Sequence, residues 1–162
     1  MLFRSSRVAE YSTTDGSLKR VIPMPGAVSV VGASYDGSRI YYLGARQSGG
    51  NRPVYRATEM QRVLVATVPP QVTEAVMVEE KALLTNGEDG SITLTDLASK
   101  QQIWRNKLSS RQLGNCQVSP DHKYFSVVTP DQRGYLGSIA TAKILRTVSA
   151  CDTLFVLPKV DR

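Results

Sequence analysis

The feature that most constrains the fold is a unit of about 42 residues that recurs along the chain. Residues 28–43 contain an apolar run, a turn that carries Asp36, and a second run that opens with a basic and a branched residue. The same order of run, Asp-bearing turn and run appears at residues 115–128, around Asp121. The two aspartates are 85 positions apart, which is the length of two units.

A middle copy occupies the expected place, at residues 74–105. It contains an Asp89-Gly90 pair between alternating apolar residues, which is a strong short-range signal for a β-hairpin. The later halves of the units match too, since Lys100 and Lys143 end similar segments and are 43 positions apart. Helix signals are nearly absent and turn-forming clusters interrupt the chain about every ten residues, so we expect an all-β fold.

Four strands in a unit of about 40–45 residues are typical of a blade of a β-propeller. The pattern resembles the WD40-like and YVTN-type propeller families over most of the chain. The resemblance rests on three short motifs, residues 86–92 (NGEDGSI), 95–100 (TDLASK) and 119–124 (SPDHKY). The Trp-Asp dipeptide of WD40 repeats is absent, because the only tryptophan, Trp104, precedes Arg105. The resemblance implies four-stranded antiparallel blades that stack on one another.

We expect a single β-propeller-like domain over residues 1–162, with about four blades. Three whole blades are assigned to residues 26–69, 70–110 and 111–149, and a fourth to residues 1–25 together with 150–162. In the fourth blade, a strand at residues 152–158 would begin the sheet that residues 1–25 finish. Two arrangements stay open, namely a closed four-bladed ring and part of a larger propeller that another chain completes. Unpaired blade edges would favour self-association.

The chain is basic, with 20 Lys and Arg against 14 Asp and Glu and a formal net charge of +6. Such a balance favours an acidic partner, which we expect to be a protein. The basic residues are scattered and form no basic run, so contact with nucleic acid is the less favoured alternative. No apolar run approaches the ~20 residues that span a bilayer, so we expect no membrane span.

Two cysteines, Cys116 and Cys151, do not make a disulfide framework in a chain of 162 residues. We expect both to be small buried side chains. Together with the lack of an apolar signal segment, this favours a cytoplasmic protein. The Arg- and Ser-rich residues 1–7 leave a mitochondrial location as the alternative.

The residues that usually carry catalysis have structural explanations in this sequence. His122 is the only histidine and has no neighbouring cluster of Cys, Asp or Glu, so we expect neither a metal role nor acid–base chemistry for it. Asp36, Asp89 and Asp121 lie in predicted turns, where aspartate stabilises the bend by accepting backbone N–H bonds. No P-loop, Gly-x-Ser-x-Gly or Gly-x-Gly-x-x-Gly motif occurs, so we expect no enzyme, no cofactor and no metal site.

The most suggestive segment for binding is the loop at residues 44–53, which is longer than the matching turns of the other units. Arg46, Asn51 and Arg52 are its candidate partner-binding residues, since an arginine can hold a carboxylate or phosphate with two hydrogen bonds. We therefore expect a non-catalytic protein-interaction or scaffold module within a larger assembly. The alternatives are a propeller enzyme or ligand-binding protein with a central-channel site, and a basic accessory subunit that contacts nucleic acid.

Overall fold

A computed structural model describes residues 6–150, and this part of the chain is all-β. It contains fourteen strands and no helix, which confirms the prediction of an all-β fold. Cys151 and the strand predicted at residues 152–158 lie outside the described residues. The chain divides into two compact units, Met1–Pro70 and Gln71–Arg162.

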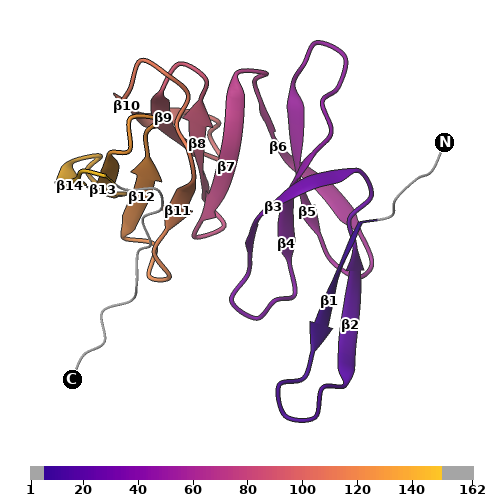
Figure 1. The fold of residues 1–162 in the computed structure, drawn as a ribbon. Helices are drawn as coiled ribbons and strands as arrows, with labels where there is room; N and C mark the ends of the chain where they lie inside the picture. The colour runs from indigo at the N-terminus through magenta and orange to yellow at the C-terminus, as the bar shows by residue number, and fades with distance from the viewer. Residues whose placement is uncertain (1–5, 151–162) are drawn as a thin grey trace. The chain divides into compact units, whose positions relative to one another are not determined.

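The first unit contains a hairpin and a four-stranded sheet, both antiparallel and both in chain order (Figure 1). The hairpin pairs β1 (Arg7–Tyr11) with β2 (Leu18–Pro23), and the sheet consists of β3 (Ala27–Ala33), β4 (Ile40–Gly44), β5 (Arg52–Ala57) and β6 (Arg62–Val68). Tyr42 of β4 is fully buried, in one cluster with Ile22 of the hairpin and Ile40 of the sheet. Burial of these large side chains therefore stabilises the packing of the hairpin on the sheet.

The second unit contains two four-stranded antiparallel sheets, again with their strands in chain order. The first sheet consists of β7 (Val72–Val78), β8 (Ala82–Gly87), β9 (Ser91–Asp96) and β10 (Gln102–Lys107). The second consists of β11 (Cys116–Val118), β12 (Tyr124–Val128), β13 (Gly134–Ser138) and β14 (Ile144–Val148). The first strands of the two sheets, β7 and β11, lie side by side (Figure 1).

One hydrophobic core joins the two sheets of the second unit. Leu84 and Ile92 come from the first sheet and Phe125 from the second, and all three are fully buried. Trp104 of β10 packs on Phe125 with ring centroids 5.6 Å apart. Its indole Nε1–H donates a hydrogen bond of 2.8 Å to Ile139 O. Apolar packing and a satisfied polar group thus both join the sheets, as expected for a buried tryptophan.

The two sheets of the second unit repeat the same backbone contacts. Leu97 N–H donates to Lys81 O at 2.8 Å, and 42 positions later Ile139 N–H donates to Lys123 O at 2.9 Å. In each sheet this bond connects the turn after the third strand to the turn after the first strand. The repeat seen in the sequence therefore has a counterpart in hydrogen bonding.

The register of this repeat differs by one residue from the predicted match of Lys100 with Lys143. Lys100 and Ala142 both have a left-handed backbone, with φ of 60° and 59°, in the turn before the outermost strand. Their positions differ by 42, so Ala142 is the structural counterpart of Lys100. The predicted register was wrong because it matched two lysine side chains, whereas the turn constrains the backbone.

Each of the segments predicted as whole units, residues 26–69, 70–110 and 111–149, contains one four-stranded sheet. No closed propeller or barrel is found in the part of the chain that the structure describes. The identity of the sheets as propeller blades therefore stays a prediction. Between residues 6 and 150, no helix is long and apolar enough to cross a membrane.

Candidate functional site

A buried serine and an aspartate build the turn between β11 and β12. Ser119 Oγ donates a hydrogen bond of 2.6 Å to Asp121 Oδ1 and accepts one of 2.9 Å from the Tyr124 N–H. The same Asp121 oxygen accepts the Lys123 N–H at 3.2 Å. These bonds favour the charged carboxylate and lower the pKa of Asp121, the Ser119 hydroxyl having the largest effect. The turn therefore holds the residue between Asp121 and Lys123 in a defined position.

The same turn occurs in the first unit. Ser34 Oγ donates to Asp36 Oδ1 at 2.6 Å and accepts the Arg39 N–H at 2.9 Å. Gly37 occupies the position that His122 has in the second unit, and both residues have positive φ, 66° and 56°. The match between the two Asp-bearing turns in the sequence thus corresponds to one hydrogen-bonded structure. In the second unit this structure also presents an imidazole.

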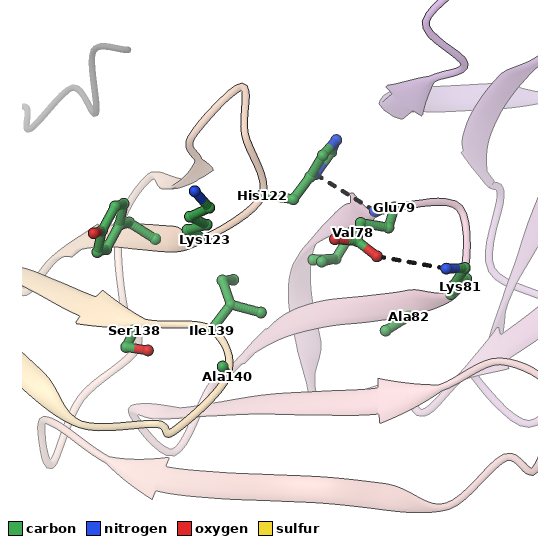
Figure 2. Close-up of a pocket in the computed structure, with 10 residues that line it drawn as sticks. Val78, Glu79, Lys81, Ala82, His122, Lys123, Ser138, Ile139 and Ala140 are labelled. Atoms are coloured by element: carbon green, nitrogen blue, oxygen red, sulfur yellow. Dashed lines mark hydrogen bonds and ion pairs between the residues drawn. The ribbon is translucent and has the colours of Figure 1, made fainter. Parts of the chain in front are cut away.

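A pocket of about 400 Å³ lies where the β11–β12 turn meets the β7–β8 and β13–β14 turns of the second unit (Figure 2). Its floor consists of Val78, Ala82, Ile139 and Ala140. The first three of these belong to the shared hydrophobic core, so packing from below holds the floor in place. Ala140 is small and exposed, which leaves space above the core.

The rim of the pocket is polar and comes from all three turns, with Glu79, Lys81, His122, Lys123, Tyr124 and Ser138. His122 Nδ1 accepts a hydrogen bond of 3.4 Å from the Glu79 N–H (Figure 2). The neutral imidazole therefore carries its proton on Nε2 and presents an N–H donor on the other side of the ring.

Two lysines carry the positive charge of the rim. Lys81 Nζ lies 3.7 Å from Glu79 Oε2, and Lys123 Nζ lies 3.8 Å from Asp121 Oδ2. All four side chains are at least 47% exposed, and ion pairs as exposed as these contribute little to stability. Either lysine can therefore turn toward a ligand at small cost.

The pocket combines an apolar floor with cationic and N–H donors. Its volume is at the lower end of the range of about 300–1,000 Å³ that is usual for ligand pockets. This chemistry fits a ligand that has an apolar part and a carboxylate or another anionic group. Among residues 6–150, no group of three or more His, Cys, Asp or Glu side chains lies together in a way that suits a metal ion.

A second polar cluster lies deeper in the second unit, between β7, β8 and the start of β11. Glu74 Oε2 accepts hydrogen bonds from the Cys116 N–H at 2.8 Å and from Asn86 Nδ2 at 3.3 Å. Asn86 Nδ2 also donates to Gly114 O at 2.9 Å. These bonds join the two sheets. Asn86 is fully buried, and its Oδ1 atom has no hydrogen-bond partner within the described residues.

Burial dominates the electrostatics of this cluster. It raises the pKa of the Glu74 carboxyl, although the hydrogen bond from the Cys116 N–H acts in the opposite direction. Burial, together with the Glu74 charge, also raises the pKa of the Cys116 thiol far above its usual range. The thiol thus stays protonated at neutral pH and is a poor nucleophile. Cys116 is buried, as expected.

The predicted partner-binding residues lie in the first unit, in the loop between β4 and β5. Arg46 and Asn51 are exposed, and Asn51 O accepts the Gln47 N–H at 2.8 Å. Arg52 begins β5 and is partly buried, and its Nε atom is buried without a hydrogen-bond partner in the described part of the chain. Two of the three residues thus lie in this loop and the third begins the strand after it. None of the three lines the pocket, and their role in binding stays a prediction.

Sequence reasoning missed the lysines of the rim and the Glu74 cluster. Lys81 and Lys123 are 42 positions apart, so a closer comparison of the repeat units would have paired them. Glu74 and Asn86 carry no comparable signal, because their roles depend on the packing of one sheet on the other. Comparison with known proteins adds no further residues: no known family's model matches the chain, and no curated protein is significantly similar to it.

Proposed function

We propose that this protein is a non-catalytic interaction or scaffold module built from propeller-type blades, and that it works within a larger assembly. The observation that carries the proposal is the structure of the second unit. Each of its two four-stranded meanders contains the same hydrogen bond between turns, 42 residues apart in the sequence, and both meanders pack on one core. Successive blades of a propeller stack in this way because a single small sheet cannot bury both of its faces alone.

The distribution of side chains supports an interaction role. Repeat proteins of this kind bind their partners through turns and loops on a rigid scaffold. In the second unit the core consists mainly of strand residues, whereas the turns carry exposed charged residues around the pocket. The turns are themselves held by hydrogen bonds such as those of Ser119 with Asp121 and Tyr124. A binding surface made from such turns is preorganised, which lowers the entropic cost of association.

Chemical cross-linking in the cells that produce the protein tests this proposal. We expect the tagged full chain to cross-link reproducibly to one or a few partner proteins and to elute with them at a fixed stoichiometry. Light scattering on the purified chain then separates the two propeller arrangements. A stable monomer supports a ring closed by this chain, and a defined oligomer supports completion by another chain. Elution as a single free chain without reproducible cross-links would contradict the proposed function.

A ligand-binding role for the Glu74 cluster is the second candidate, and one observation favours it. The buried Oδ1 atom of Asn86 is an acceptor without a donor in the described residues, and such atoms commonly bind a water or a ligand group. A small amine would supply both a donor to Asn86 and a charge opposite to that of Glu74. Thermal unfolding in a panel of small amines tests this role. Stabilisation of the wild type but not of Glu74→Gln would support it, and a panel without any stabilising amine would remove it.

A further inference from the structure

We infer that the pocket between the three turns binds an extended segment of a partner protein, in which an acidic side chain lies next to an apolar one. The inference rests on the proposed function, because it specifies the partner's chemistry and the site that recognises it. The apolar side chain occupies the floor of the pocket, and the acidic side chain contacts the lysines of the rim.

The floor is a preformed apolar surface. Val78, Ala82 and Ile139 are 5%, 7% and 7% exposed and belong to the core that joins the two sheets. They cannot move into the hollow without disturbing that core. An apolar side chain placed above them removes apolar surface from water, which favours binding. Ala140 is the small residue that leaves this space open (Figure 2).

The rim supplies donors for a carboxylate from two directions. Lys81 comes from the β7–β8 turn, and His122 and Lys123 come from the β11–β12 turn. Among residues 6–150, Glu79 is the only acidic side chain in the lining, against two lysines, and Asp121 pairs with Lys123 from outside the lining. Lysine ammonium groups are compact charges on flexible stems, and their present ion pairs are exposed and weak. The acid of a partner can therefore replace Glu79 or Asp121 as the partner of either lysine.

A protein segment fits this pocket better than a small inorganic anion does. An anion such as phosphate would use the lysines and leave the apolar floor in contact with water. A purely apolar segment would make no contact with the charges of the lysines or with the His122 N–H. Only a ligand with both chemistries uses the floor and the rim together, and neighbouring side chains of an extended peptide supply both.

Selection from a random peptide library displayed on phage tests the inference on the full chain. We expect the enriched peptides to contain Asp or Glu close to a Leu, Ile, Phe or similar residue. Fluorescence anisotropy then gives the affinity of each enriched peptide, which we expect to fall as ionic strength rises. Enriched peptides without acidic residues, or no enrichment at all, would overturn the inference.

Two substitutions change the pocket, and each has a matched control in the same unit. Lys123→Glu reverses a rim charge, and Ala140→Trp fills the floor with a large side chain. We expect each to weaken peptide binding by about tenfold or more, equivalent to about 1.4 kcal/mol. Arg146→Glu makes the same charge change on β14. Ala98→Trp makes the same size change in the equivalent turn 42 residues earlier, and we expect both controls to bind within about twofold of the wild type.

The outcomes separate this inference from the proposed function. If peptides enrich but bind the Ala140→Trp and Lys123→Glu variants as tightly as the wild type, the chain is a binding module and this pocket is not its site. If free glutamate competes as well as the peptides do, the acid alone is recognised and the peptide assignment is wrong. Circular dichroism of all four variants confirms that each one retains its strands.

Discussion

At the scale of single residues, a turn stabilised by an aspartate side chain recurs along the chain. In three Asp-Gly-Ser triplets, the aspartate Oδ1 accepts both the N–H and the hydroxyl of the serine two positions later. The aspartates are Asp15, Asp36 and Asp89, and the glycine in each triplet has a φ between 66° and 79°. At the rim of the pocket, His122 takes the place of that glycine, with a φ of 56°. A β-carbon in this conformation is strained, so the imidazole is present at a cost to stability.

Replacing His122 by glycine should therefore stabilise the protein relative to replacing it by alanine. Both variants lose the weak hydrogen bond from the Glu79 N–H, so this bond does not contribute to the difference between them. We expect His122→Gly to be more stable than His122→Ala by up to about 1 kcal/mol, since relief of strain exceeds the added freedom of the unfolded chain. Urea unfolding measures this difference. Equal or greater stability of His122→Ala would show that the strain of a β-carbon in this turn does not exceed the added freedom of the unfolded glycine chain.

Ser119 makes the turn of the candidate site, and its loss should be costly. The side chain is 2% exposed, and its hydroxyl is the acceptor for the Tyr124 N–H and a donor to Asp121. We expect Ser119→Ala to reduce the free energy of unfolding by about 1–3 kcal/mol, because a polar group at the turn loses its partner. Ser34→Ala, at the same position in the first unit, should show a similar loss. The exposed Ser48 is the control, and Ser48→Ala should change stability by less than about 0.5 kcal/mol.

At the scale of the elements, the outermost strands of both sheets in the second unit share one irregularity. The pairing of β10 with β9 skips Ile103, and the pairing of β14 with β13 skips Leu145. The two residues are 42 positions apart, and both are about half exposed. A bulge that interrupts an outer strand disfavours the addition of another strand there. Self-association through blade edges, which the sequence predicts, is therefore less favourable at these two edges than at a regular strand.

A glycine sets the packing inside the last sheet. Gly137 of β13 pairs with Phe125 of β12, and a β-carbon at Gly137 would lie 2.2 Å from the Phe125 ring. Because Phe125 is fully buried and Trp104 packs on it, the ring has little room to move. We expect Gly137→Ala to cost about 1–3 kcal/mol of stability, measured by thermal or urea unfolding.

A second variant shows whether this loss comes from the clash with the ring. Phe125→Leu removes the ring and creates a cavity, so by itself it should also destabilise the protein. In the double variant the alanine at position 137 has room. We therefore expect the double variant to lose less stability than the sum of the losses of the two single variants. Strict additivity would exclude the Phe125 ring as the cause of the Gly137→Ala effect.

The strands and turns could be predicted from sequence because their signals are local. Alternating apolar residues around the Asp89-Gly90 pair predict β8 and β9, and the order of turn and strand in each unit predicts the repeat. The pocket could not be predicted, since it depends on where three turns from two sheets meet. The contact of Glu74 with Asn86 and Cys116 joins residues 12 and 42 positions apart, and no local pattern encodes it. The length of the loop at residues 44–53 predicts a binding role for it, but length carries no information about which residues surround the loop.

At the scale of the whole molecule, two sets of carboxylates act on stability with opposite signs. Hydrogen bonds from serine lower the pKa of the turn aspartates. The Ser17 N–H has the largest effect on Asp15, whose pKa falls to about 2, and the Ser34 hydroxyl has the largest effect on Asp36. A lowered pKa stabilises the folded state above the unfolded value of about 4, and this contribution is lost as the pH falls through the folded value. Burial raises the pKa of Glu74, so its contribution is present below about pH 4 and is lost as the pH rises through the raised value.

The free energy of unfolding of the wild type should therefore be highest in weakly acidic solution. It should decline toward neutral pH, and the Glu74→Gln variant should not show this decline. Both hydrogen bonds to Glu74 end on one oxygen, Oε2, so the glutamine oxygen can accept them without a buried charge. The Cys116 thiol interacts with the Glu74 charge, and it stays neutral over this range. In urea unfolding from pH 4 to pH 8, the free energy of unfolding of Glu74→Gln should increase relative to that of the wild type as the pH rises. Parallel curves for the two proteins would mean that Glu74 keeps an ordinary pKa and that its burial costs nothing.

Glu74→Ala, which removes both hydrogen bonds, should be less stable than Glu74→Gln throughout, because the Cys116 N–H and the Asn86 amide lose an acceptor.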